Sequence, residues 1–173
     1  MSWFGLATGK AALYETMVRA YASDMYRFAF WLCRDRNIAE DLVQETCLRA
    51  WKNWQSLNDV QASKQWLFTI LRREYARLYQ PNKPQLVDME IEELEELVSY
   101  DAMPALELND MLEKLPITYR EPLLLQVLGG FTCQEIAQMI DTTEAAVMAR
   151  VSRARRMLRE LLQDPETRRE KLK

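Results

Sequence analysis

The segment 132–162 constrains the fold of this chain more strongly than any other. It holds two runs of apolar residues at helical spacing, separated by the polar sequence Asp141-Thr142-Thr143. Thr132 and Glu135 have the spacing of a capping box at the start of the first run, and Thr143 can cap the second. Two helices joined by so short a turn must pack against each other. The segment therefore predicts a helix-turn-helix.

Apolar residues predict the inner faces of these two helices. In the first helix they are Ile136, Ala137 and Ile140, and in the second they are Val147, Val151 and Leu158. Ala137 is small at the point where the two helices must cross closely. This pattern strengthens the prediction of a helix-turn-helix.

The outer side of the second helix is basic. It carries five arginines and has acids only at its ends: Arg150, Arg153, Arg155, Arg156 and Arg159. Arginine grips phosphate bidentately and reads guanine edges in the major groove. We therefore expect DNA binding, with bases facing Ala145, Met148, Ala149, Ser152 and Arg153, and with phosphate or solvent facing Arg155, Arg156 and Arg159. A solvated basic helix in a protein-binding hairpin is the alternative.

The rest of the chain also favours helices, because only four glycines and six prolines interrupt its 173 residues. One helix is predicted to follow the N-cap Asn37, with Glu40 three residues on, and to run to about residue 54. The other predicted helices are 22–33, 64–79, 105–114, 118–128, 132–140 and 144–162. Thr118 and Glu121 fit a second capping box, which would put Pro122 in a first turn.

Composition divides the chain into parts. We predict an all-α fold of two small helical domains, 21–80 and 104–163, joined by a flexible acidic linker, 81–103. Residues 1–20 form an extension without an assignable role, and 164–173 a charged tail. The linker holds seven acids and no Lys or Arg between Asp88 and Asp101. A solvated spacer is the favoured interpretation of this run, although a specific role or a short amphipathic helix is also compatible with it.

Two features of the first domain suggest binding surfaces. Asp41, Gln44 and Glu45 have the spacing of one helix face beside apolar residues, which suits a basic protein partner. In the next helix, aromatic residues alternate with cations: Trp66, Phe68, Tyr75 and Tyr79 with Arg72, Arg73 and Arg77. Rings that stack on bases beside cations that hold phosphate suit single-stranded nucleic acid. Core packing is the competing interpretation of Trp66 and Phe68.

Several classes of function are disfavoured. The chain has no histidine, and its three cysteines (Cys33, Cys47 and Cys133) lie far apart, so we expect reduced thiols and neither a metal site nor a disulfide scaffold. No Gly-rich phosphate loop and no nucleophile–base pair is visible, so we expect neither an enzyme nor a cofactor. Without a targeting segment or a long apolar run, a cytoplasmic protein with no membrane insertion is expected.

Two motifs in order resemble a known family. DLVQETCLRAW followed by QWLFTILRRE resembles the second conserved region of bacterial RNA polymerase sigma factors. LPITYREPLLLQVLGGFTCQEIAQMIDTTEAAVMARVSRARRML resembles the fourth region. The short connection between them is similar to that of the extracytoplasmic-function (group four) subclass. The resemblance covers about 21–162 and implies a promoter-specificity subunit that helps to melt DNA.

The resemblance also implies roles for individual residues. Asp41, Gln44 and Glu45 would dock on the clamp helices of the largest polymerase subunit. The segment 57–79 would read the minus-ten promoter element, with Trp66, Arg72, Arg73 and Arg77 as the candidate contacts. The second domain would read the minus-thirty-five element and pack on the flap of the second-largest subunit. There, Thr132, Cys133 and Gln134 would meet the DNA backbone, Met148, Ser152 and Arg153 would read bases, and Arg155 and Arg156 would hold phosphate. The linker would thread toward the active centre.

Other functions remain open from the residues alone. A stand-alone regulator would bind a palindromic operator as a dimer through the same helix-turn-helix. A helical adaptor or a binder of the anti-sigma type would leave the arginine-rich helix incidental. For a sigma factor, an anti-sigma factor is the further partner that we expect, beside core polymerase and promoter DNA.

Overall fold

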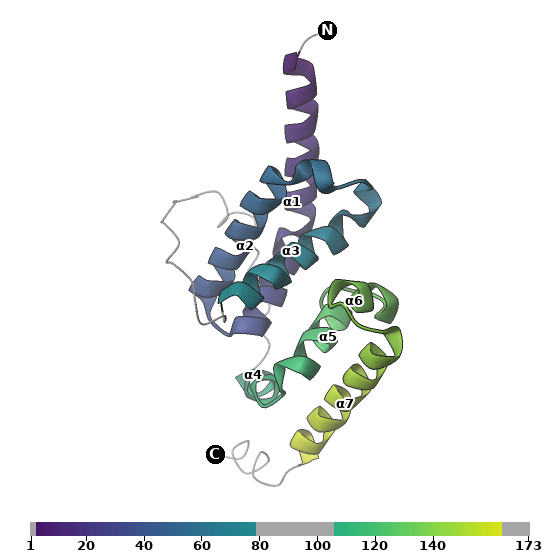
Figure 1. Cartoon of the computed structure of the whole chain (residues 1–173). Helices are drawn as coiled ribbons and strands as arrows, with labels where there is room; N and C mark the ends of the chain where they lie inside the picture. The colour runs from purple at the N-terminus through teal and green to yellow at the C-terminus, as the bar shows by residue number, and fades with distance from the viewer. Residues whose placement is uncertain (1–2, 79–105, 164–173) are drawn as a thin grey trace. The chain divides into compact units, whose positions relative to one another are not determined.

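The computed structural model describes residues 3–78 and 106–163, and every element in these two ranges is helical (Figure 1). The chain divides into two compact units, Met1–Ser99 and Tyr100–Lys173. The predicted all-α class with two helical domains is therefore confirmed. The predicted linker 81–103 and tail 164–173 lie outside the described residues.

The N-terminal unit is built on three long helices: α1 (Trp3–Cys33), α2 (Arg36–Lys52) and α3 (Ser63–Leu78). Two short 3-10 turns, η1 (Trp54–Ser56) and η2 (Val60–Ala62), connect α2 to α3. The three helices pack against one another around side chains that are almost fully buried, among them Met25, Phe28, Leu32, Val43, Leu67, Phe68 and Leu71. Burial of this apolar surface stabilises the unit.

The start of α1 differs from the prediction. The helix begins at Trp3 rather than near Ala22, so residues 3–20 are the first half of α1 and not a separate extension. Two side chains explain the longer helix. Met17 is buried, and Tyr14 packs against the end of α2. In the sequence, the apolar residues of this half-helix stand among polar ones, because only one of its sides packs against the rest of the unit.

The turn between α1 and α2 is also tighter than predicted. Arg34 adopts a positive φ of 64° directly after α1, and Asp35 caps α2. The Asp35 carboxylate accepts a hydrogen bond of 3.0 Å from the N–H of Ile38. Asn37, the predicted cap, already lies inside α2. The prediction was wrong by two residues, because Asp and Asn both favour this role and the sequence offers both.

The C-terminal unit comprises α4 (Leu106–Glu113), α5 (Ile117–Val127), α6 (Cys133–Met139) and α7 (Glu144–Gln163). The helix α7 packs against α4, α5 and α6 (Figure 1). The core of the C-terminal unit includes the buried side chains of Leu112, Leu115, Leu125, Ile136, Val147 and Val151. The helix-turn-helix predicted from the sequence corresponds to α6 and α7.

One of the two predicted capping boxes is present. The Glu135 N–H donates to Thr132 Oγ1 (3.2 Å), and the Thr132 N–H donates to Glu135 Oε2 (2.8 Å). Thr143 also caps α7 as predicted, since its Oγ1 accepts from the N–H of Ala146 at 3.2 Å. These caps fix where both helices of the motif begin.

The second predicted capping box, at Thr118 and Glu121, is wrong. The helix α5 begins at Ile117 after Pro116 and has no side-chain cap. The proline ring, with its fixed φ, starts the helix, so that Thr118 already lies in the first turn. Pro122 consequently lies inside α5 and not in its first turn.

Two glycines shape the connection from α5 to α6. A Cβ added at Gly129 would lie 2.5 Å from the carbonyl oxygen of Leu125 and from the ring of Phe131. Gly130 adopts a φ of 72°, which favours glycine. The two residues therefore let α5 end abruptly and place Thr132 at the start of α6.

Across residues 3–78 and 106–163, no helix is both long enough and apolar enough to cross a membrane.

Candidate nucleic-acid interface

The helix α7 has a distinct inner face. Val147, Val151 and Ala154 are buried against the rest of the C-terminal unit. Leu158, predicted to complete this face, is only half-buried, as is Ile140 at the end of α6. Ala154 lies three residues beyond Val151 on the same side of the helix and takes the predicted place of Leu158 in the core.

The predicted base-reading residues lie on the other sides of α7. Met148 keeps 57% of its surface exposed, and Ser152 and Arg153 are also exposed. Arg155 and Arg156 follow on the same exposed surface. At the start of α6, Thr132 and Gln134 are exposed, whereas Cys133 is half-buried. This arrangement leaves α7 open to a partner along much of its length.

Arg155 is held in place within the unit. Its Nη2 donates a hydrogen bond of 2.7 Å to Oε1 of Gln126 on α5. The Gln126 amide donates in turn to Sγ of Cys133, at 3.5 Å. Gln126 therefore joins α7 to the first residue of α6. Gln126 could not be predicted from the sequence, because a single glutamine on a helix carries no signal of its partner.

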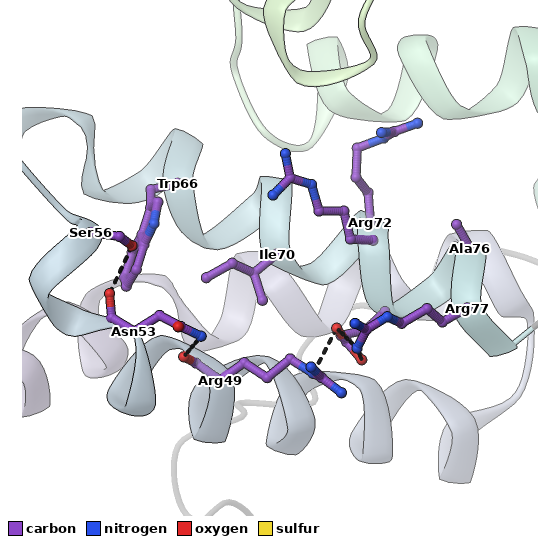
Figure 2. A pocket seen from close by; sticks show the side chains of 10 residues that line it. Arg49, Asn53, Ser56, Trp66, Ile70, Arg72, Ala76 and Arg77 are labelled. Atoms are coloured by element: carbon purple, nitrogen blue, oxygen red, sulfur yellow. Dashed lines mark hydrogen bonds and ion pairs between the residues drawn. The ribbon is translucent and has the colours of Figure 1, made fainter. Parts of the chain in front are cut away.

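The N-terminal unit contains a pocket of about 600 Å³ between the end of α2, η1 and α3 (Figure 2). Its lining includes the four residues that the resemblance gave as candidate minus-ten contacts: Trp66, Arg72, Arg73 and Arg77. Phe68, by contrast, is fully buried in the core. The structure thus separates the two interpretations of this helix, with Trp66 at the pocket and Phe68 in the core.

The remaining lining residues were not predicted. Asn53 and Ser56 come from the end of α2 and from η1, and Arg49 from the last turns of α2. Ser56 Oγ donates to the carbonyl oxygen of Asn53 (2.7 Å), and Asn53 Nδ2 donates to that of Arg49 (2.9 Å). Figure 2 shows these bonds beside the Trp66 ring. Only the packing of α2 on α3 brings these residues to the pocket, so the sequence held no direct signal.

The pocket is cationic. Four arginines line it together with one acid, Glu74, whose side chain is only 6% exposed. Glu74 Oε1 forms ion pairs with Arg49 Nε (2.7 Å) and with Arg77 Nη1 (3.0 Å). The first is an ion pair without hydrogen-bond alignment. An excess of positive charge beside the half-buried Trp66 ring suits a single strand of nucleic acid, whose bases stack and whose phosphates need cations.

The predicted protein-docking face on α2 is less uniform than expected. Asp41 is exposed, but Gln44 and Glu45 are half-buried. Glu45 Oε1 lies 2.8 Å from Arg49 Nε. Of the two carboxylates on the predicted docking face, that of Glu45 is therefore already engaged by a residue that lines the pocket.

The cysteines are free thiols and half-buried: Cys33, Cys47 and Cys133. Burial raises the pKa of the Cys47 thiol to about 11. The hydroxyl of Tyr14 donates a hydrogen bond of 2.6 Å to the carbonyl oxygen of Cys47. Burial, followed by the neighbouring Cys47 charge, raises the pKa of Tyr14 far above its ordinary value. Among the residues that the structure describes, no group of acidic or cysteine side chains could hold a metal ion.

Comparison with known families assigns both units. Residues 17–83 match Sigma-70 region 2, and residues 105–158 match Sigma-70, region 4. The ECF RNA polymerase sigma factor EcfG of Rhodopseudomonas palustris (strain TIE-1) is 33% identical over 149 residues, which span 84% of this chain and 82% of that protein. The chain belongs to the ECF sigma factors. It is therefore a promoter-recognition subunit of RNA polymerase.

Other sigma factors support this assignment. The ECF RNA polymerase sigma factor SigL of Mycobacterium tuberculosis is 30% identical over 169 residues, 92% of this chain and 94% of that protein. The solved structure of the sigma factor RpoE from Bartonella quintana, in complex with the anti-sigma factor NepR, matches with a TM-score of 0.62 at 26% identity. That match covers 93% of this chain and 98% of that one. The ECF sigma factor fold thus extends across both units.

Proposed function

We propose that this sigma factor captures the minus-ten strand in the pocket between α2, η1 and α3. The observation that carries the proposal is that Trp66, Arg72, Arg73 and Arg77 line one cationic pocket. Capture of unstacked bases on a ring offsets the cost of opening the duplex, and the arginines hold the phosphates. In this way the pocket promotes melting without a catalytic step, and the protein is not an enzyme.

The minus-thirty-five element is read by the helix-turn-helix in this proposal. Met148, Ser152 and Arg153 face the bases, and Arg155 and Arg156 face phosphate, as do Thr132, Cys133 and Gln134 at the start of α6. Exposure of the outer surface of α7 supports these roles. The hydrogen bond from Arg155 to Gln126 fixes one guanidinium, which favours a phosphate contact over base reading at that position.

Polymerase docking is assigned to Asp41, Gln44 and Glu45 on α2, which would meet the clamp helices of the largest subunit. The C-terminal unit would pack on the flap of the second-largest subunit, and residues 81–103 would thread toward the active centre. The functional domains would be 21–80 and 104–163. Two weak DNA readers on one enzyme give specificity, because both elements must be present at the correct spacing.

An anti-sigma factor is a further proposed partner. The sigma factor RpoE of Bartonella quintana was solved in complex with the anti-sigma factor NepR, and CnrH, a protein of similar fold, was solved in complex with the cytosolic domain of CnrY. The protein would act in the cytoplasm, where bacterial polymerase meets the chromosome. A candidate anti-sigma protein should abolish transcription by the holoenzyme and displace core polymerase in size-exclusion chromatography. Coelution of all three components would contradict a competitive partner.

In vitro transcription tests the minus-ten proposal. Core polymerase with the full-length protein should start transcripts at specific sites in a genomic library. On a promoter mapped in this way, Arg73→Ala should lower open-complex formation about tenfold, the size of a lost strand contact. Arg19→Ala is the matched control, since Arg19 is an exposed arginine on α1 that pairs with Glu15. Equal activity of the two variants would show that the pocket is not the strand site.

A further inference from the structure

The first half of α1 packs on the connection that forms one wall of the pocket. The Tyr14 ring lies edge-on to Trp51, with centroids 5.0 Å apart, and edge-on to Trp54, at 5.7 Å. Its hydroxyl donates to the carbonyl oxygen of Cys47 on α2. Lys10, one turn earlier on α1, places its ammonium 4.9 Å from the Trp51 ring. Tyr14 therefore contacts both the last turn of α2 and the first residue of η1.

Trp54 links these contacts to the pocket. On one side it meets Tyr14, and on the other it lies edge-on to Trp66, with centroids 6.5 Å apart. Its neighbours Asn53 and Ser56 line the pocket, as does Trp66 itself. The two neighbours are joined by a hydrogen bond of their own, from Ser56 Oγ to the Asn53 carbonyl. A row of three rings thus runs from the first half of α1 to the pocket wall.

Apart from the rings, this wall is supported by local hydrogen bonds that join residues 49 to 57 to one another. The turn η1 holds no buried residue, and its N-cap Asn53 makes no side-chain capping bond there. A short exposed 3-10 turn is a weak element by itself. Aromatic contacts with Tyr14 are therefore a major part of what keeps Trp54 against Trp66.

We propose that Tyr14 is a positioning residue for the pocket: it holds η1 and Trp54 so that the Trp66 ring and the Asn53–Ser56 wall are preformed for an unstacked base. The inference rests on the proposed capture of the minus-ten strand in this pocket. Preformed geometry raises affinity, because less ordering is needed when the strand binds. Tyr14 touches no DNA in this proposal and acts through Trp54.

Strand affinity of the assembled holoenzyme tests this role. The probe is a fluorescein-labelled single-stranded oligonucleotide that carries the non-template minus-ten sequence of a promoter mapped with the wild-type protein. Tyr14→Ala should raise its dissociation constant about fivefold, which corresponds to about 1 kcal/mol and to the loss of about one aromatic pair. Tyr14→Phe keeps the ring and should remain within about twofold of wild type. Leu13→Ala changes an exposed neighbour on α1 and should have no effect.

The readout separates positioning from folding. A purely structural role would reduce the fraction of competent protein and hence the amplitude of the titration, but would leave the dissociation constant unchanged. The slope of affinity against salt should also be unchanged in Tyr14→Ala, because the phosphate contacts remain. Where Tyr14→Ala does not assemble with polymerase, Tyr14→Leu keeps apolar bulk without the ring, and the same fivefold loss is expected.

Failure of the inference differs from failure of the proposed function. If Arg73→Ala weakens strand binding while the Ala or Leu variant of Tyr14 binds as wild type does, the positioning role is overturned and the pocket stands. If Arg73→Ala binds the strand as well as wild type does, the pocket itself is not the strand site and both proposals fall.

Discussion

Arg49 Nε lies 2.7 Å from Oε1 of Glu74 and joins α2 to the only acidic side chain among the pocket-lining residues. The same nitrogen lies 2.8 Å from Glu45 on the proposed docking face. Arg77 completes the row on the other side of Glu74. Four charged residues thus run from the docking face to the pocket, and Glu74 is the most buried of them.

Neutralising Glu74 should destabilise the N-terminal unit. Glu74→Gln leaves Arg49 and Arg77 without their shared counter-charge in a poorly solvated place, which costs about 3 kcal/mol of unfolding free energy. Urea unfolding of the full chain followed by tryptophan fluorescence measures this change, because all five tryptophans lie within residues 3–66. Glu45→Gln is the matched control. Its side chain is more exposed, and the expected loss is below about 0.5 kcal/mol. Equal losses of unfolding free energy in the two variants would contradict the larger contribution of Glu74 to stability.

The Cys47 thiol should remain protonated in mildly alkaline solution. Its pKa rises from 9.0 to about 11 on folding. Below pH 9 the thiol is neutral in both states, whereas between pH 9 and 11 the unfolded chain loses the proton first. The unfolding free energy should therefore fall as pH rises through this window.

Alkylation kinetics measure this shift. In a Cys33→Ser/Cys133→Ser variant, Cys47 should react about a hundredfold more slowly at pH 8 than the same chain in urea, since its thiolate is that much scarcer. The rate should increase tenfold per pH unit up to about pH 11. A plateau near pH 9 would show that burial does not raise the pKa.

Removing the cap of α6 should loosen the start of the helix-turn-helix. Thr132→Ala loses the Oγ1 acceptor of the Glu135 N–H and should cost about 1 kcal/mol. Amide hydrogen exchange at Glu135 should accelerate about fivefold as a result. Thr118→Ala is the control variant. Because α5 has no side-chain cap, this change should leave the exchange rate at Glu135 unaffected. Faster exchange in both variants would indicate a general loss of stability.

Two arginines on α7 should have different effects on duplex binding. Arg153→Ala should relax the preference at one base pair of the minus-thirty-five element by about 1–3 kcal/mol. Arg156→Ala should weaken binding to all sequences alike and reduce the salt slope by about one. Competition between promoter mutants for the holoenzyme measures both effects. If Arg153→Ala instead weakened binding to all promoter sequences equally, Arg153 would be a phosphate contact and not a base-reading residue.

The sequence by itself determined the class of fold and the motif. Apolar spacing of three and four gave the helices, and Thr132 with Glu135 marked the start of α6 correctly. These features are local, because a capping box and an amphipathic face depend only on residues within one or two turns. For the same reason the arginines of α7 were visible without any structure.

Competing local signals caused the errors. Asp35 and Asn37 both suit a cap, and Thr118 has the spacing of a capping box although Pro116 already starts α5. The first half of α1 was missed, since its partner lies more than thirty residues away: Tyr14 bonds Cys47 at a separation of 33 residues. No short window of sequence contains both groups.

Only the tertiary structure decided which side chains share a site. Trp66 and Phe68 are two residues apart, and packing placed the first at the pocket and the second in the core. Arg49 and Glu74 meet because α2 packs on α3. Ion pairs and pocket walls depend on how helices cross, and the crossing is set by the fit of the whole core. The sequence thus determined the helices, and their packing decided the pocket.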